Sequence, residues 1–387
     1  MSSVKPLIVG VPREIKTREK RVGLTPEGCR TLTAQGIEVL VESGAGTASG
    51  FADADYKQSG AQITPDARSL YAGARLILKV KEPQLSELPM IRPEHILFCY
   101  LHLASPENAR LLLGLLQSGT TAIAFETVSA DGRMPLLKPM SEIAGGLAAA
   151  FGAYLVTLRG VLKEPLFYPD DFQNSLERIA SSFPEVPQNL AAPSVVIWGG
   201  GVAGEKALEF WLKMKGHAAL VEKNPERRSA LTAKWGPQGA RLFSPENLPG
   251  DVLQNADVWI GCVHQAGARA FQVVQESVLQ TASKAVKKII VDVSIDQGGN
   301  FPFAHPRTYD DPLYWDPFGN LRFSVSNMPS LCGPEASRAL EKATLPYIIA
   351  LAEGLEKAFD RYPELRNAVN VKDGQILLEA VRFAHAA

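Results

Sequence analysis

The sequence VVIWGGGVAGEKALEF, residues 195–210, contains a glycine pattern that restricts the possible fold more than any other part of the chain. Gly199, Gly201 and Gly204 form a G-x-G-x-x-G frame that follows a strand-like run and opens a helical one. In a nucleotide-binding unit the first glycine makes the tight turn, the second lets a pyrophosphate approach, and the third allows close helix–strand packing. The pyrophosphate then faces the positive end of the helix. The pattern predicts a Rossmann-type unit; a packing turn without a ligand is the alternative.

Glu222 ends the next strand-like run, AALVEKN. It lies about 20 residues beyond the glycines, where a carboxylate can hold both ribose hydroxyls of a dinucleotide. Because a carboxylate repels a 2′-phosphate, we expect NAD rather than NADP as the cofactor. Arg227 and Arg228 follow closely and keep NADP open, since arginine can accommodate that phosphate.

Strand-like and helical runs alternate almost throughout the 387 residues, as is typical of α/β proteins with parallel sheets. A chain of this length exceeds one ordinary core, so two domains are expected. One series of strands is predicted in PLIVGVP, IEVLVES, ARLILKVKEP, ILFCYLHLA and TAIAFETV, and a second in SVVIWGGG, AALVEKN, ADVWIGCV and KKIIVDVSID. We therefore predict an α/β protein with two Rossmann-like, doubly wound domains and an interdomain cleft.

Helices are predicted at two clear positions in the first series. One opens at TPEG, where Thr25 can cap the helix and a proline occupies its first position. The other covers SPENARLLLGLLQSG, with Ser105 as cap and Gly119 as stop. Beyond residue 329 the chain is expected to be helical to its end and to pack on the first domain.

Composition and charge exclude several classes of partner. A net charge of −1 gives no basic footprint for nucleic acid or anionic membranes. The longest apolar region, IAGGLAAAFGAYLVTL, is rich in Gly and Ala, and we interpret it as a buried helix rather than a membrane span. The start of the chain lacks a signal-peptide pattern. Four scattered cysteines show no metal-ligand spacing, so a cytoplasmic protein with reduced thiols and no metal is expected.

The stretch YLHLA, residues 100–104, places one of only six histidines at the end of an otherwise apolar strand. Read as a strand, Tyr100 and His102 face one side and the two leucines the other. A hydrogen-bonded core histidine is one interpretation. Ligands of open α/β sheets bind at the carboxyl ends of strands, however, and Lys81 in LKVKEP is expected to end a neighbouring strand. Lys81 and His102 are therefore candidates for one cleft.

Arg21, in the loop TREKRVGLTP, is a third candidate. An arginine and a lysine together suit a small carboxylate, which the arginine can bind through its bidentate fork. Lys79 is expected to share a strand face with Lys81. Each of these charges alone is also compatible with a solvated surface position. Beside such cations, a histidine that titrates near pH 7 suits general acid–base catalysis.

Together these segments resemble the alanine dehydrogenase family, which is related to the first domain of proton-pumping transhydrogenases and to saccharopine dehydrogenases. The likeness covers most of the chain and rests on collinear motifs: VGVPREIKTREKRVGLTPEG, VLVESGAG, LKVKEP, YLHLA, FETV, PLLKPMSEIAG, GGGVAG, VDVSIDQGG and NMP. The resemblance implies a substrate domain of residues 1–135 and 334–387, an NAD-binding Rossmann domain of residues 136–333, and catalysis in the cleft between them.

The resemblance also implies the roles of individual residues. His102 is the expected acid/base group, and Asp296 in SIDQGG is the expected carboxylate near the reacting amine. Substrate contacts are expected from Arg21, Lys81, Tyr100, Met140, Asn327 and Met328. Cofactor contacts are expected from Ser141, Gly199, Gly201, Val202, Ala203, Gly204 and Glu222.

Two segments depart from the family pattern. After NMP the chain continues as SLCGPEAS instead of a stretch similar to Gly-Ala-Val-Pro-Arg, and this change leaves the preferred amino acid open. A longer segment that contains prolines and acidic residues, from Lys163 to Pro193, replaces the family's Gly- and Val-rich one. A homo-oligomer is expected, but not necessarily the hexamer usual in the family.

Three functions are compatible with these features. An NAD-dependent amino-acid dehydrogenase would reversibly deaminate a small L-amino acid to a 2-oxo acid and ammonia. A saccharopine- or opine-type dehydrogenase would condense an amino acid with a 2-oxo acid, and would prefer a second amino acid to ammonia as the amine donor. A nucleotide-binding module of a membrane transhydrogenase would have no use for Asp296. The sequence favours the first function.

Overall fold

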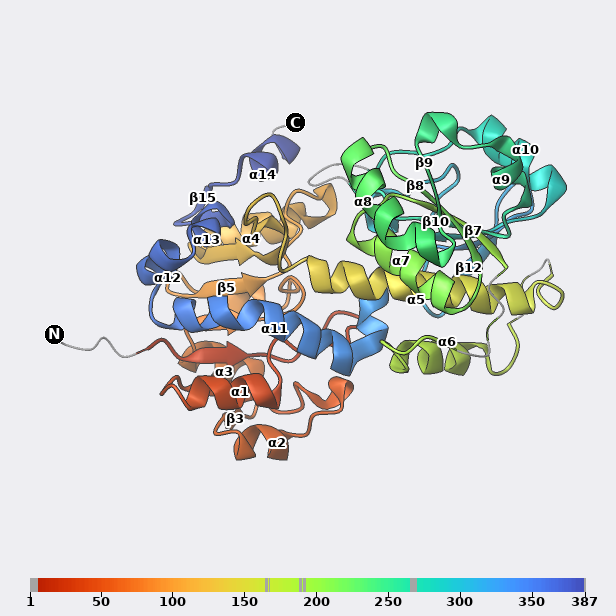
Figure 1. Cartoon of the computed structure of the whole chain (residues 1–387). Coiled ribbons are helices and arrows are strands. Elements are labelled where there is room, and N and C mark those ends of the chain that lie inside the picture. Colours follow the sequence, from red (N-terminus) through yellow and green to blue (C-terminus); the bar gives the residue numbers. More distant parts are fainter. Residues whose placement is uncertain are drawn as a thin grey trace. The chain divides into compact units, whose positions relative to one another are not determined.

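The computed structural model describes residues 6–163, 166, 168–187, 190, 193–264 and 270–385. The chain forms two compact units (Figure 1). The first unit contains Met1–Met140 and Ser330–Ala387, and the second contains Ser141–Pro329. Each unit is built around its own sheet of mainly parallel strands, which confirms the predicted α/β class.

The first unit contains an eight-stranded sheet in the order β15-β14-β6-β5-β4-β1-β2-β3. The strands are β1 Val9–Val11, β2 Val39–Glu42, β3 Gln62–Thr64, β4 Leu76–Leu78, β5 Ile96–Cys99, β6 Thr121–Ala124, β14 Val369–Lys372 and β15 Gln375–Ile376. β1 to β6 are parallel, whereas β14 and β15 join antiparallel. The helices are α1 Pro26–Thr33, α2 Asp53–Gln58, α3 Ala67–Gly73, α4 Ala109–Ser118, α11 Gly333–Ala352, α12 Leu355–Arg361, α13 Pro363–Asn367 and α14 Glu379–Ala384.

Two strands of this sheet end earlier than the sequence predicts. β4 ends at Leu78, and β5 ends at Cys99, so the interpretation of YLHLA as strand is wrong. The backbone N–H groups of Leu101 and His102 donate to the carboxylate of Glu126 instead of to a neighbouring strand, and this diverts the chain from the sheet. The expected division of side chains nevertheless persists, because Leu101 lies buried in the core while His102 is exposed.

The predicted helix signals are confirmed at three of four positions. Thr25 accepts a hydrogen bond from the backbone of Gly28 at the start of α1, and Gly119 adopts a left-handed conformation at the end of α4. A proline follows Thr25 at the first helical position, as predicted. Ser105 is not the cap of α4, since a 3₁₀ turn, η3 Pro106–Asn108, comes between them.

The C-terminal segment joins the first unit, where α11, blue in Figure 1, packs beside α1. The expectation that this segment is helical throughout is wrong. Its sequence VNVK forms β14, which pairs with β6 and places Val371 in the apolar core.

The second unit contains a seven-stranded sheet in the order β12-β13-β11-β10-β7-β8-β9. The strands are β7 Ser194–Trp198, β8 His217–Val221, β9 Arg241–Phe243, β10 Val258–Gly261, β11 Ile289–Asp292, β12 Leu313–Trp315 and β13 Leu321–Phe323. The strands are parallel except for β12, which pairs antiparallel with β13. The order reverses beside β7, the first strand of this unit, and dinucleotides bind at this kind of switch point.

The helices of the second unit include a long apolar one. They are α5 Lys138–Leu158, α6 Phe172–Ser181, α7 Val202–Lys213, α8 Pro225–Trp235, α9 Gly250–Asn255 and α10 Glu276–Ala285. By length and composition α5 could cross a membrane, but 67% of its most apolar window is buried inside the protein. This burial agrees with its interpretation as a core helix.

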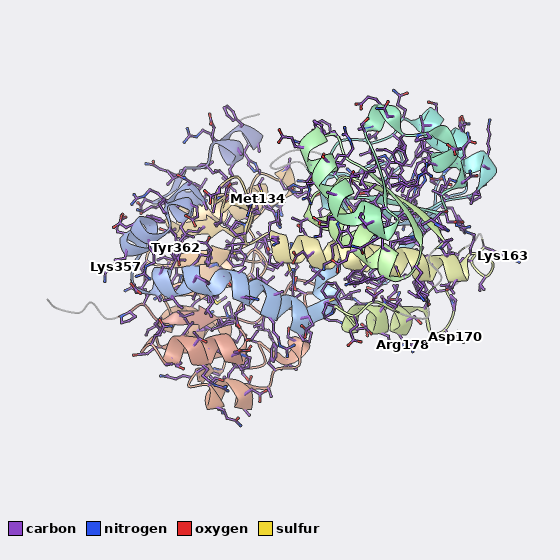
Figure 2. The ribbon with its side chains drawn as sticks, viewed as in Figure 1. Met134, Lys163, Asp170, Arg178, Lys357 and Tyr362 are labelled. Carbon is purple, nitrogen blue, oxygen red and sulfur yellow. The ribbon has the colours of Figure 1, made fainter. Side chains whose placement is uncertain are left out.

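The segment from Lys163 to Pro193, which departs from the family pattern, contains α6 in its described part. Tyr168 donates to Asp311 (2.7 Å), and the side chain of Gln173 donates to the backbone of Tyr309 (2.6 Å). At the surface, Arg178 pairs with Asp171 at the start of the helix. Figure 2 labels Arg178 and also Asp170, which directly precedes Asp171. The segment thus packs against the region of the second unit that leads into β12.

Candidate active site

Charged and polar side chains follow four neighbouring parallel strands of the first unit. Arg21, Lys81, His102 and Glu126 come after β1, β4, β5 and β6, respectively, and these strands are adjacent in the sheet. Because the strands are parallel, their carboxyl ends meet at one edge. That edge is where open α/β sheets bind ligands.

Lys81 and His102 lie together at this edge, as predicted. The Lys81 Nζ is 3.4 Å from the His102 Nε2. Lys81 is buried, so the alternative of a solvated surface charge is wrong for it; His102 is exposed, so the core interpretation is wrong for it. The buried ring of Tyr100 stacks parallel to the His102 ring at 5.8 Å, and its hydroxyl donates to the backbone of Leu136 (2.7 Å).

The backbone at His102 is held in an unfavourable conformation. Its φ is +48°, which costs a non-glycine residue on the order of 1 kcal/mol. Glu126 compensates by accepting from the His102 N–H (2.6 Å), and the His102 carbonyl accepts from Ser105 (2.9 Å) and Asn108 (3.0 Å). Burial raises the pKa of Glu126, while the donated N–H groups and Lys81 oppose the shift. The backbone from which the imidazole projects is therefore held in place, and the ring itself contacts Lys81 and Tyr100.

Arg21 is buried and paired with Glu19. Its Nε and Nη2 donate to the two carboxylate oxygens of Glu19, each at 2.6 Å, and its Nη1 lies 3.0 Å from the Met140 sulfur. Burial lowers the pKa of Arg21, but the adjacent Glu19 outweighs it and leaves that pKa raised. Glu19 fills the Nε–Nη2 edge of the guanidinium, so the predicted contact of Arg21 with a substrate carboxylate would have to involve Nη1. Met140 does lie beside Arg21, as expected.

Lys79 belongs to a separate buried group. Its Nζ lies 3.2 Å from Glu14 and 3.1 Å from Glu87. Glu14 also accepts from the backbone N–H groups of Val80 (2.6 Å) and Lys81 (3.3 Å). Lys79 and Lys81 therefore do not act as one pair on a strand face, since the strand ends before both. Lys79 stabilises the Glu14 carboxylate, which holds the Lys81 backbone.

A cavity of about 350 Å³ opens beside Arg21 and Glu19. Its walls come from the residues that follow β1 and from the loop after β2: Arg13, Glu14, Glu19, Arg21, Gly44, Ala45, Thr47 and Ala48. The cavity is polar on the first side and lined by small side chains on the second.

The glycine loop of the second unit connects β7 to α7. Gly199 has a φ of +94°, and a Cβ on Gly204 would lie 1.8 Å from the Gly199 carbonyl oxygen. A Cβ on Gly201 would meet no atom within 4 Å. The first and third glycines are thus required by the backbone, whereas the second borders open space at the helix N-terminus, as Val202 and Ala203 open α7. These residues fit a dinucleotide pyrophosphate.

Glu222 lies directly against this loop. Its carboxylate accepts from the backbone N–H of Gly200 and of Asn224, each at 2.7 Å. Arg227 donates to the Gly200 carbonyl (2.8 Å) and pairs with Glu205. The structure thus places the carboxylate beside the glycines, and it ties Arg227 into the same loop.

Ser141 lies on the first part of α5. One turn later, a Cβ on Gly145 would lie 2.0 Å from the Ala203 carbonyl oxygen, so this face of α5 packs tightly against the glycine loop. Residues four apart share a helix face. Ser141 therefore lies on the face of α5 that meets the loop.

Three further predicted site residues belong to the second unit. Asp296 is exposed in a 3₁₀ turn, η7 Ile295–Gln297, directly after β11. Asn327 has a φ of +60°, and Met328 is buried at the start of another 3₁₀ turn, η8 Met328–Cys332. Their convergence with His102 and Arg21 stays a prediction.

Sequence reasoning missed several residues of these sites. Glu19, Glu14 and Glu126 occur within the motifs quoted above, and the available signal was their position just after strands. His264 follows β10 in the same way, and its Nε2 lies 3.2 Å from the Gln297 side chain in the turn of Asp296. Within the part of the chain that the structure describes, no group of three or more His, Cys, Asp or Glu side chains could hold a metal.

Comparisons with known proteins cover nearly the whole chain. Residues 10–144 match the model of the alanine dehydrogenase/PNT N-terminal domain, and residues 178–379 match that of the C-terminal domain. The alanine dehydrogenase of Halomonas elongata is 36% identical over 382 residues, covering 97% of this chain and 96% of the relative. That of Mycobacterium tuberculosis is 38% identical, covering 96% and 95%.

Solved structures give the same result. An L-alanine dehydrogenase superposes with a TM-score of 0.83 at 33% identity, covering 98% of this chain and 99% of the other. A transhydrogenase from Sinorhizobium meliloti, at 19% identity and a TM-score of 0.74, shares the fold. With both domain models matched in order and full-length relatives above 30% identity, the chain belongs to the alanine dehydrogenase/PNT family.

Proposed function

We propose that this protein is an NAD-dependent dehydrogenase that reversibly deaminates a small L-amino acid, with alanine as the preferred one, to the 2-oxo acid and ammonia. The observation that carries the proposal is the pairing of Lys81 with His102 at the strand ends that also present Arg21. The full-length alanine dehydrogenase relatives support alanine as the substrate.

NAD, when bound, accepts the hydride from the α-carbon of the substrate. The glycine loop from Gly199 to Gly204 would hold its pyrophosphate at the N-terminus of α7. Glu222 would hold the ribose hydroxyls. Ser141 on α5 would contact the phosphates from the other side of the loop.

The substrate carboxylate would be bound by the cations of the first unit. Arg21 offers its Nη1 side, and Lys81 offers an ammonium group that is buried and therefore little screened by water. Tyr100, Met140, Asn327 and Met328 would form the walls of the substrate site. Together these groups would hold the α-carbon for hydride removal.

His102 would act as the acid/base group. A neutral imidazole can take a proton from the water that attacks the imine and return it to the departing ammonia. Asp296 would stabilise the positive charge that develops on the substrate nitrogen. Because Glu126 holds the His102 backbone while Lys81 and the Tyr100 ring contact the imidazole, the imidazole would be positioned before the substrate arrives.

A panel of L-amino acids with NAD tests the proposal directly. NADH formation should be fastest with alanine, and in the reverse direction ammonium should serve as the amine donor for pyruvate. A higher rate with a second amino acid as the donor would instead indicate reductive condensation. Absence of NADH formation with every amino acid would contradict the proposal.

We also propose that the enzyme is a cytoplasmic homo-oligomer without nucleic-acid or membrane partners. Its net charge of −1 supports the absence of nucleic acid, and its four buried free cysteines suit a reducing compartment. Light scattering coupled to gel filtration measures the oligomeric state; a monomeric mass would contradict this part of the proposal.

A further inference from the structure

We propose that Glu19 is a positioning residue for the substrate site: it fixes the plane of the Arg21 guanidinium so that Nη1 faces the substrate carboxylate. This inference deepens the proposed function and rests on it. A carboxylate side chain is unexpected in a site that binds a substrate carboxylate, because like charges repel. The proposed role accounts for the presence of Glu19.

The geometry of the pair is bidentate. Glu19 accepts from Nε and Nη2 of Arg21 at 2.6 Å each, and also from the Arg21 backbone N–H at 3.0 Å. The two side chains are 0% and 2% exposed, so the pair is shielded from water. A guanidinium is planar, and fixing two of its nitrogens fixes the direction of the third. Glu19 therefore determines where Nη1 points.

Nη1 contacts an acceptor that a substrate can replace. It lies 3.0 Å from the sulfur of Met140, and a thioether is a weak acceptor compared with a carboxylate. Exchange of this contact for a charge-assisted hydrogen bond is favourable. Exchange of the Glu19 contacts would instead leave a buried carboxylate without its partner, at a large cost.

The loop around Arg21 is also anchored by contacts that do not involve Glu19. The Val22 N–H donates to the hydroxyl of Ser337 (3.0 Å), and Ser49 donates to the carbonyl of Lys20 (2.6 Å). Ser337 belongs to SLCGPEAS, one of the two segments that depart from the family pattern. The backbone is thus held on both sides of Arg21, and removal of Glu19 should reorient the side chain without moving the loop.

Steady-state kinetics of Glu19→Gln test the inference. The amide has the same size but cannot accept from both guanidinium nitrogens. We expect the KM for L-alanine and for pyruvate to rise about tenfold or more, while kcat and the KM for NAD stay within about threefold. Glu19→Asp keeps two acceptor oxygens and the charge, and should recover part of the lost affinity.

Glu42→Gln is the matched control. Glu42 accepts from the Arg13 backbone N–H (2.9 Å) in the same unit, and the Arg13 side chain is largely exposed. This variant should keep the wild-type KM for alanine. Melting temperatures of all variants, measured by circular dichroism, separate loss of folding from loss of substrate affinity.

Each outcome decides the question. A raised KM for both carboxylate substrates with partial recovery in Glu19→Asp supports the inference. A lowered KM in Glu19→Gln means that Glu19 competes with the substrate, and an unchanged KM with a lower melting temperature means a structural role; either result overturns it. Wild-type protein without turnover would contradict the proposed function and this inference with it, whereas an active wild type with an unaffected variant contradicts the inference alone.

Discussion

The two units present their sites at the same place in the sheet but build them from different groups. In the first unit, the strand ends carry buried side-chain charges: Arg21 with Glu19, and Lys81 beside His102. In the second unit, the end of β7 carries backbone N–H groups and the three glycines of the G-x-G-x-x-G frame, with Glu222 as the main side chain beside them. In the proposed function, the first site would discriminate by charge, and the second by the space left around its backbone.

This difference predicts how each site fails. A site made of side chains loses chemistry when one functional group is removed, whereas the fold survives because the neighbouring backbone is anchored separately. A site made of backbone loses affinity when a side chain is added. Substitutions in the two units should therefore separate turnover from cofactor affinity.

The largest effect is expected for His102→Ala. Removal of a general acid/base group typically lowers turnover by roughly 10²–10⁴-fold. The Kd for NADH should stay unchanged because the glycine loop belongs to the other unit, and the melting temperature should change little because the side chain is exposed. Turnover and melting measured on one sample check this; near-normal turnover would remove His102 from the mechanism.

Gly201→Ala should break the second site without affecting its fold. The added methyl group meets no protein atom within 4 Å, so the melting temperature should stay the same. It would occupy the space that the pyrophosphate needs, and the Kd for NADH should rise about 10- to 100-fold. In Gly204→Ala the methyl group meets the Gly199 carbonyl, so this variant should also melt at a lower temperature. Unchanged NADH binding in Gly201→Ala would contradict a dinucleotide at this loop.

The same contrast explains what the sequence could predict. The glycine loop is local: its frame, the strand before it and Glu222 after it could be read from one short segment. The charged site is assembled from residues far apart in the chain. The sequence around Arg21 does not show that Glu19 binds the Nε and Nη2 atoms of its guanidinium. The early end of β5 before His102 could not be predicted for the same reason. The chain leaves the sheet there because its backbone donates to Glu126, which lies 24 residues further on.

A smaller effect is expected for Glu222→Gln. The amide keeps one acceptor for the Gly200 N–H but removes the negative charge, so the repulsion of a 2′-phosphate disappears. NAD should bind several-fold more weakly, and NADP should weaken less or improve. The ratio of the two Kd values, measured by quenching of protein fluorescence, is the readout. Equal weakening of both cofactors would show that Glu222 does not face the ribose.

A final effect concerns stability rather than ligand binding. Asp292, at the end of β11, is fully buried, and this burial raises its pKa to about 6. The N–H groups of Asn300 and Ser294 and the positive charge of Arg322 act in the opposite direction but do not cancel the effect of burial. The folded second unit therefore binds more protons than the unfolded chain between about pH 4 and pH 6, and its stability should fall as the pH rises through this window. The loss is at most on the order of 3 kcal/mol, since each pKa unit corresponds to about 1.4 kcal/mol.

Tryptophan fluorescence can follow this change in the second unit alone. All five tryptophans lie between residues 141 and 329, so urea unfolding detected in this way reports the second unit. Asp292→Asn cannot ionise and should lose the decline between pH 4 and pH 6, even where its overall stability is lower because the amide has only one acceptor oxygen. The difference between wild type and variant isolates Asp292, because carboxylates with raised pKa values in the first unit, such as Glu126, are present in both proteins. A variant that keeps the wild-type dependence of stability on pH would show that Asp292 does not titrate between pH 4 and pH 6.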